Sequence, residues 1–243
     1  MDMRAPLTVL PLRLDNVVFE VNGRRIIDGV DLTLEPGTRT IVVGPNGAGK
    51  SVLLRLCHGL LLPTAGSVRW SGPELPGAPR RQAMVFQRPV LLRRSALANV
   101  DYALRLARLP KTERVLRAGE ALHRVGLFDR ADASARVLSV GEQQRLALAR
   151  AWALAPEVLF LDEPTASLDP GATHEIERVI DAMHADGTKI VMVTHNLGQA
   201  RRLGDEIVFL HRGRVAERSP VDVFFRQPRS EEAARFLEGE LPW

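Results

Sequence analysis

Hydrophobic and polar positions change their spacing along the chain, and the changes predict both strands and helices. Residues 12–21 and 30–35 alternate between apolar and polar side chains, which is typical of strands with one face in water. Residues 40–43, 158–161 and 190–193 are instead continuous apolar runs, as expected for parallel strands covered on both faces. We therefore expect an α/β fold with a mostly parallel core sheet and an antiparallel β subdomain.

Helical spacing occupies much of the chain between these strands. The pattern predicts helices over 142–154 and 173–185. Between 88 and 136 the strand signals vanish and two helical patterns follow one another. We interpret this stretch as a helical insert in one domain that covers residues 1–243.

The loop that follows residues 40–43 has the sequence of a phosphate-binding loop. It fits G-x-x-x-x-G-K-[ST] and lies between a predicted strand and a predicted helix, which is the context that the motif requires. Its backbone N–H groups would form a concave anion site, to which the helix N-terminus adds partial positive charge. The residues predicted to bind the nucleoside triphosphate are Gly44, Pro45, Asn46, Gly47, Ala48, Gly49, Lys50 and Ser51.

Two carboxylates follow the apolar run 158–161. They emerge at the carboxyl end of a predicted parallel strand, where ligands bind in open α/β sheets. Asp162 is suited to hold Mg²⁺, and Glu163 to polarise an attacking water as a general base. The alternative is an acidic loop that only caps the next helix.

A further anion-binding helix start is predicted at residues 138–145. Ser139 and Glu142 have the spacing of a capping box that opens an amphipathic helix. The phosphate-binding loop already serves a nucleotide within the chain. A second such helix start is useful if it serves the nucleotide of another subunit.

Charge and composition exclude several classes of function. The 243 residues are 45% hydrophobic and 26% charged, with a net charge of +4. The arginines are scattered among acids without a basic stripe, so we expect no nucleic-acid partner. Cys57 is the only cysteine, which excludes an internal disulfide and suits a reducing compartment. No apolar run reaches the length of a membrane span, and Pro6 and Pro11 break the short apolar patch at 7–12. We therefore expect a cytosolic chain that reaches a membrane only through a partner.

With these motifs in this order, the chain resembles the ATP-binding cassette (ABC) ATPases over nearly its full length. Residues 44–51 match the Walker A motif, 158–162 the Walker B strand and 138–143 the family signature. Single residues also match the Q-loop glutamine, the catalytic glutamate and the switch histidine, namely Gln87, Glu163 and His195. The resemblance implies a P-loop NTPase fold of the ABC nucleotide-binding type.

The same resemblance implies a head-to-tail homodimer that closes on ATP and Mg²⁺. The P-loop of one subunit would face the signature of the other, whose contacting residues would be Ser139, Val140, Gly141 and Glu142. Ser51, Gln87 and Asp162 would hold Mg²⁺. The catalytic residues would be Glu163, His195 and Lys50.

Two positions depart from the family pattern. Val140 stands where the signature has its first glycine, and its Cβ disfavours a positive φ and a close approach to phosphate. We expect dimer closure to survive but to be weaker. Near the adenine, the usual stacking aromatic falls at Val21, so either Val21 makes a plain apolar contact or Phe19 compensates. Weak discrimination between ATP and GTP would follow.

The insert resembles that of importer subunits. Residues 87–100 would dock on an integral membrane permease, which would place the chain peripherally at the cytoplasmic face of the membrane, with a periplasmic or extracellular binding protein as an indirect partner. The alternative is a non-transport ABC ATPase, such as one for cluster assembly.

The cargo is suggested only by family likeness. Residues 44–59, 80–89 and 236–243 resemble tungstate-type importers, with phosphate and molybdate as neighbouring possibilities. A regulatory domain at the C-terminus is not expected.

Overall fold

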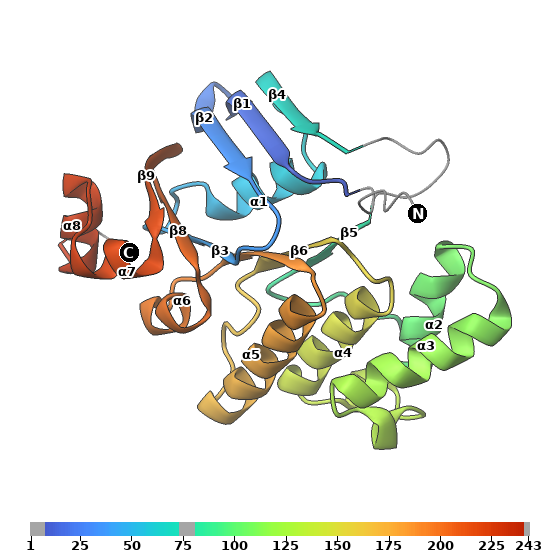
Figure 1. The fold of residues 1–243 in the computed structure, drawn as a ribbon. Coiled ribbons are helices and arrows are strands. Elements are labelled where there is room, and N and C mark those ends of the chain that lie inside the picture. Colours follow the sequence, from blue (N-terminus) through green and yellow to red (C-terminus); the bar gives the residue numbers. More distant parts are fainter. Residues whose placement is uncertain (1–7, 73–80, 241–243) are drawn as a thin grey trace, which may run out of the picture. The chain divides into compact units, whose positions relative to one another are not determined.

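The computed structural model describes residues 8–72 and 81–240, so Leu7, Arg80 and the chain end from Leu241 to Trp243, which carry part of the interpretations above, lie outside the described residues. The chain divides into two compact units (Figure 1). The first unit combines Met1–Arg80 with Lys189–Trp243, and the second is Arg81–Thr188.

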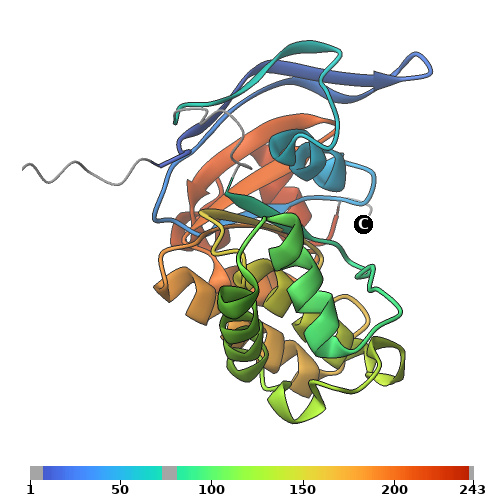
Figure 2. The same ribbon diagram turned by 90° about the vertical axis from the view of Figure 1, so that its right-hand side faces the viewer.

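An antiparallel sheet in the first unit confirms the predicted β subdomain (Figure 2). Its strands are β1 (Leu12–Val21), β2 (Arg24–Leu34) and β4 (Ala65–Trp70), in the order β2-β1-β4. Between β1 and β2, Asn22 and Gly23 have φ values of 50° and 74°, as a two-residue hairpin turn requires. The second strand begins at residue 24 rather than 30, because residues 24–29, which do not alternate between apolar and polar side chains, also pair with β1.

The first unit also contains the parallel strands β3 (Thr40–Val43), β7 (Lys189–Val193) and β8 (Glu206–His211), with β8 paired to antiparallel β9 (Arg214–Pro220). All residues of β3 and β7 are buried. Continuous apolar runs therefore correspond to parallel strands, as predicted.

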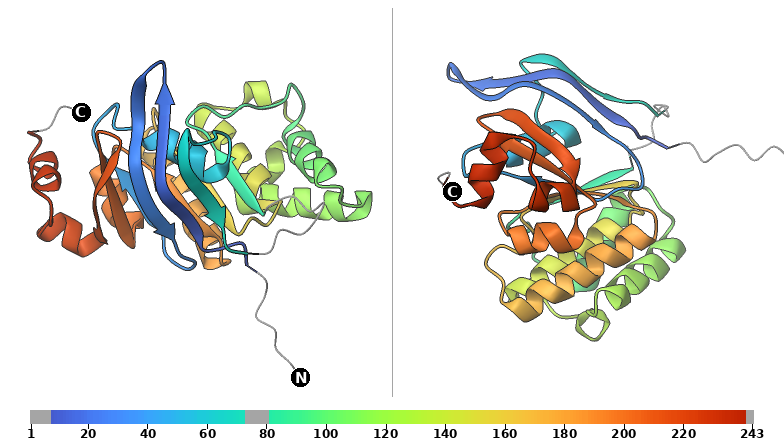
Figure 3. Two further views of the ribbon diagram at one scale, coloured as in Figure 1. Left: turned by 90° about the horizontal axis from the view of Figure 1, so that it is seen from above. Right: turned by 60° about the vertical axis from the view of Figure 1, so that its left-hand side comes forward.

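The described part of the first unit also contains four helices. They are α1 (Lys50–His58), α6 (Leu197–Leu203), α7 (Val221–Arg226) and α8 (Glu231–Leu237). The last two follow β9 near the chain end (Figure 3). Cys57 is buried in α1, and burial raises the pKa of its thiol to about 12.

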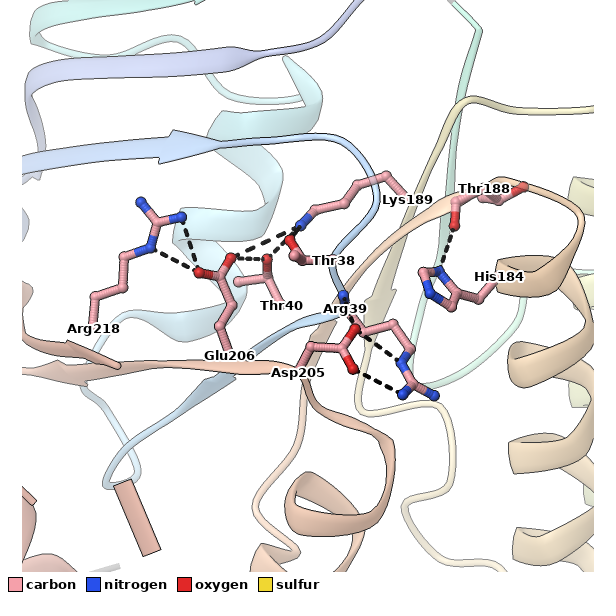
Figure 4. A network of polar contacts seen from close by, with 9 residues as sticks. All are labelled: Thr38, Arg39, Thr40, His184, Thr188, Lys189, Asp205, Glu206 and Arg218. Atoms are coloured by element: carbon pink, nitrogen blue, oxygen red, sulfur yellow. Dashed lines mark hydrogen bonds and ion pairs between the residues drawn. The ribbon is translucent and has the colours of Figure 1, made fainter. Parts of the chain in front are cut away.

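A buried polar network lies where β3, β7 and β8 begin (Figure 4). Lys189 is 1% exposed, and its Nζ donates hydrogen bonds of 2.7 Å to the hydroxyls of Thr38 and Thr40. Glu206 accepts a hydrogen bond from Thr40 and pairs with Arg218 at 2.9 Å. Burial lowers the pKa of Lys189 from its ordinary 10.5 to about 8.

The second unit contains the parallel pair β5 (Gln82–Val85) and β6 (Val158–Asp162). Its helices are α2 (Ala96–Leu106), α3 (Lys111–Arg124), α4 (Val140–Trp152) and α5 (Pro170–Ala185), with short 3₁₀ turns at Phe128–Arg130 and Ala135–Val137. Helix α4 packs against α2, α3 and α5. Within the ranges that the structure describes, no helix has both the length and the apolar character needed to cross a bilayer.

Candidate nucleotide-binding site

The phosphate-binding loop joins β3 to α1, as its sequence predicts. Gly44 has a φ of 150°, and a Cβ placed on it would lie 2.0 Å from the carbonyl oxygen of Leu210. Gly49, the N-cap of α1, has a φ of 102°, and a Cβ there would lie 2.8 Å from the carbonyl oxygen of Ile26. Both glycines are therefore required by the tight packing of the loop as well as by its backbone conformation.

Lys50 is the first residue of α1, and its side chain turns back into this loop. Its side chain is buried, and its Nζ donates hydrogen bonds to the carbonyl oxygens of Gly44 at 2.7 Å and Pro45 at 2.9 Å. The ammonium group is thus held at the N-terminal end of α1, where the backbone also carries partial positive charge. Half-buried Ser51 follows in the first turn of the same helix. A concave loop with a buried cation fits the charge of a nucleoside triphosphate.

His195 and the P-loop lie at the same edge of the parallel strands. Val42 of β3 pairs with Val193 of β7, so Gly44 and His195 each follow a paired residue by two positions. The side chain of His195 is exposed. It precedes α6, whose N-cap Asn196 accepts a hydrogen bond from the backbone N–H of Gln199.

The candidate adenine contact lies at the end of β1. Val21 is 43% exposed and pairs with Arg24 across the hairpin. Phe19 is half-buried and pairs with Ile27. Both apolar side chains are therefore partly available, and the two alternatives for the adenine contact stay open.

The second unit brings Gln87, Asp162 and Glu163 to one edge of its parallel pair. Val85 of β5 pairs with Leu161 of β6, and the three polar residues follow this pair within two positions. Asp162 is 5% exposed, whereas Gln87 is exposed. Glu163 is half-buried and has a φ of 48°, a left-handed conformation that costs a non-glycine residue about 1–2 kcal/mol. Strain of this kind is concentrated at functional sites.

The signature residues form the capping box that the sequence predicts. Ser139 Oγ accepts a hydrogen bond from the backbone N–H of Glu142 at 3.2 Å, and Glu142 Oε2 accepts one from the backbone N–H of Ser139 at 2.8 Å. This second hydrogen bond is the main reason that the pKa of Glu142 lies below its usual value. Gly141 packs against α5, since a Cβ on it would lie 3.0 Å from the Cβ of Ala172.

Val140 requires a correction. The expectation that its Cβ opposes a positive φ does not apply, because Val140 is the first helical residue of α4 and is absent from the positive-φ positions of the described backbone. Its side chain is 60% exposed. Any effect of this valine on closure therefore comes from the bulk of an exposed side chain.

The P-loop, His195 and Val21 belong to the first unit, whereas Gln87, Asp162, Glu163 and the signature belong to the second. In the described parts of both units, no group of three or more His, Cys, Asp and Glu side chains could hold a metal ion.

The sequence motifs did not predict the role of three polar residues that hold the loop containing Gln87. Asn99, Gln144 and Arg150 all hydrogen-bond to backbone atoms of this loop. A signal was present for Gln144, because it stands at helical spacing with Ala147, Leu148 and Ala151 on the buried face of α4. A polar residue on such a face indicates a buried hydrogen-bond partner.

Strand, glycine loop, helix and buried lysine together define a P-loop nucleotide-binding protein. The ABC transporter family model matches residues 27–166, and the chain belongs to this family. A tungstate uptake ATP-binding protein from Peptoclostridium acidaminophilum is 40% identical over 217 residues, which cover 89% of this chain and 100% of that protein. A methionine import ATP-binding protein from Corynebacterium diphtheriae is 36% identical over 92% of this chain and 69% of its own length.

A solved structure gives the same family assignment. It is the dimeric post-hydrolysis state of an ATP-binding cassette bound to ADP and Pi. The two chains are 29% identical and superpose with a TM-score of 0.76, over 86% of this chain and 98% of that one.

Proposed function

We propose that this chain is the ATP-hydrolysing subunit of an ABC importer, with an oxyanion such as tungstate as the transported species. The observation that carries the ATPase proposal is the P-loop with its buried Lys50 ammonium group. The importer proposal is supported by two relatives that are named for uptake or import. The tungstate relative is the more similar of these two, which supports the oxyanion.

Hydrolysis requires an attacking water and stabilisation of charge on the transferred phosphoryl group. We assign the polarisation of this water to Glu163, whose carboxylate would take up its proton as the bond to the γ-phosphorus forms and the bond to the leaving ADP oxygen breaks. Lys50 would stabilise charge on the β- and γ-phosphates, and His195 would contact the γ-phosphate. Ser51, Asp162 and Gln87 are the residues that would hold Mg²⁺. When bound, this ion would neutralise charge on the phosphates.

The active form proposed here is a head-to-tail homodimer. The N-terminus of α4, with Ser139, Val140, Gly141 and Glu142, would face the nucleotide of the partner subunit. The dimeric solved relative supports this assembly. Residues 87–100 would contact a membrane permease, which would hold the chain at the cytoplasmic face of the membrane, and a binding protein outside the membrane would deliver the cargo.

The deciding experiment is hydrolysis of Mg²⁺-ATP by the purified chain and by Glu163→Gln, with size-exclusion chromatography in ATP. Loss of a general base lowers turnover by about 10²–10⁴-fold. We expect this loss together with retained ATP binding and an ATP-dependent dimer. Glu175→Gln is the control, because Glu175 is a surface acid of α5 that pairs with Arg178. Turnover that is equal in Glu163→Gln and wild type would contradict the assignment of Glu163.

The cargo is tested in cells that carry or lack the gene. We expect tungstate accumulation to fall on deletion and to recover with the wild-type gene but not with the Glu163→Gln gene. Unchanged accumulation of tungstate, molybdate and phosphate, together with lost methionine uptake, would contradict the oxyanion proposal.

A further inference from the structure

The segment from Phe86 to Ser95, here termed the Gln87 loop, joins β5 to α2 in the second unit (Figure 1). The side chain of Gln87 is exposed. The backbone on both sides of it, however, is held by side chains of α2 and α4. These contacts involve only the backbone of the loop, so they act regardless of its side chains.

Gln144 holds the beginning of the loop. It is 2% exposed on α4, and its Nε2 donates a hydrogen bond of 3.3 Å to the carbonyl oxygen of Phe86, the residue before Gln87. Amide groups are rarely buried without such a partner, because an unsatisfied amide costs about 1–3 kcal/mol.

Arg150 holds the middle of the loop. Its Nη1 donates a hydrogen bond of 3.0 Å to the carbonyl oxygen of Val90. In the described ranges, no carboxylate forms an ion pair with Arg150, and burial lowers the pKa of its guanidinium group. A half-buried cation that interacts with a carbonyl is oriented by that contact and not by a neighbouring acid.

Asn99 holds the end of the loop. It is fully buried in α2, where its Oδ1 accepts a hydrogen bond of 2.8 Å from the backbone N–H of Leu92. Its Nδ2 donates to the carbonyl oxygens of Leu92 at 3.2 Å and Ser95 at 3.0 Å. This side chain therefore points into the protein and is not part of a docking surface.

We infer that Gln144, Arg150 and Asn99 are positioning residues that fix the backbone of the Gln87 loop, so that the Gln87 side chain reaches the nucleotide-bound Mg²⁺ in one defined place. This inference rests on the proposed function. Helix α4 also begins with the signature, so one helix carries Ser139 at its start and two of the three residues that hold the loop. A shift of α4 would move the Gln87 loop with it.

The test uses the full chain with Gln144→Met, which keeps side-chain length, and Arg150→Met, which keeps an unbranched apolar stem. Both changes remove the hydrogen-bond donor. Arg150→Lys restores a donor and is the rescue variant. Arg145→Met is the matched control, because Arg145 also lies on α4 and donates to a backbone carbonyl, but that carbonyl is Val125 O at 3.1 Å, after α3.

We expect amide hydrogen exchange in residues 86–95 to become about tenfold faster in Gln144→Met and Arg150→Met, and to stay unchanged in Arg145→Met. Turnover should fall about tenfold with a higher Mg²⁺ requirement, whereas the KM for ATP should change less than twofold. Arg150→Lys should recover most of the turnover. In a Gln87→Ala background, Gln144→Met should cause no further loss of turnover, because the two changes act through one contact.

An equal loss of turnover in both backgrounds, or unchanged exchange in the loop, would overturn the inference. A wild-type chain without ATP hydrolysis would contradict the proposed function instead. The exchange measurement then decides separately whether the Gln144 and Arg150 side chains hold the loop.

Discussion

The P-loop of the first unit and the signature and Gln87 loop of the second are built in different ways. In the P-loop the backbone itself is specialised, since Gly44, Gly47 and Gly49 all have positive φ. In the second unit ordinary helices and loops are held by side chains, as in the Ser139–Glu142 capping box and the bond from Gln144 to Phe86. A site that depends on backbone conformation tolerates little substitution. A site held by side-chain hydrogen bonds weakens by one hydrogen bond with each substitution.

Gly44→Ala tests the P-loop backbone where it is packed most closely, and it has the largest expected effect on stability. The new Cβ would lie 2.0 Å from Leu210 O, so the loop or the end of β8 must shift. We expect the free energy of unfolding to fall by about 3 kcal/mol or more, with loss of ATP binding. Urea unfolding and titration with a fluorescent ATP analogue measure both quantities.

Gly47→Ala is the control for this prediction. Gly47 also has a positive φ, of 79°, but no atom lies within 4 Å of a Cβ placed there. Only the conformational cost of about 1–2 kcal/mol remains. Equal losses of stability in the two variants would show that close packing at Gly44 is not the cause.

Most of what the sequence could predict belongs to the P-loop and the buried parallel strands. Residues 40–51 combine an apolar run with glycines at fixed spacing, and both signals are local. The pattern places the second strand at residue 30, although the two-residue hairpin turn at Asn22 and Gly23 is a local signal for the observed start at Arg24. The hydrogen bond from Arg150 to the carbonyl oxygen of Val90 joins residues 60 positions apart, which no local pattern records. The positive φ of Glu163 has no local sequence signal either. The capping box was predictable because its two residues are only three positions apart.

The pH dependence of stability tests whether the first unit also depends on a single side chain, that of Lys189. Its pKa is lowered from 10.5 to about 8, so between these values the unfolded chain binds more protons than the folded one. The free energy of unfolding should therefore rise with pH from about 8 to 10.5, by about 3 kcal/mol. Glu206, Asp205 and Glu35 favour the charged lysine, and Arg218 opposes it.

Thermal or urea unfolding of wild type and Lys189→Met across this pH range measures the effect. Methionine keeps the length of the side chain but does not titrate, so the rise should be absent from the variant. The same rise in both proteins would mean that other groups cause it.

Ser139→Ala removes one hydrogen bond from the capping box of the second unit. Loss of an N-cap costs about 1 kcal/mol, because the backbone N–H of Glu142 loses its acceptor. Turnover should fall as well, since Ser139 is proposed to face the partner's nucleotide. Ser230→Ala is the matched control, because Ser230 caps α8 in the first unit by accepting a hydrogen bond from the backbone N–H of Ala233. A control that loses stability and turnover to the same degree would argue against a separate role for Ser139.

Val140→Gly has the smallest expected effect on stability. The P-loop glycines are required by their positive φ. Val140, by contrast, begins a regular helix, and its side chain is 60% exposed. The backbone of α4 therefore needs no glycine here, and stability should change by less than about 1 kcal/mol. Turnover should rise about two- to threefold, because removal of the exposed side chain lets the helix N-terminus approach the partner's phosphates more closely. Val137→Gly controls for the loss of exposed apolar surface nearby, since Val137 is 67% exposed and lies before the signature. Turnover and ATP-dependent dimerisation that stay equal to wild type would show that the valine does not limit closure.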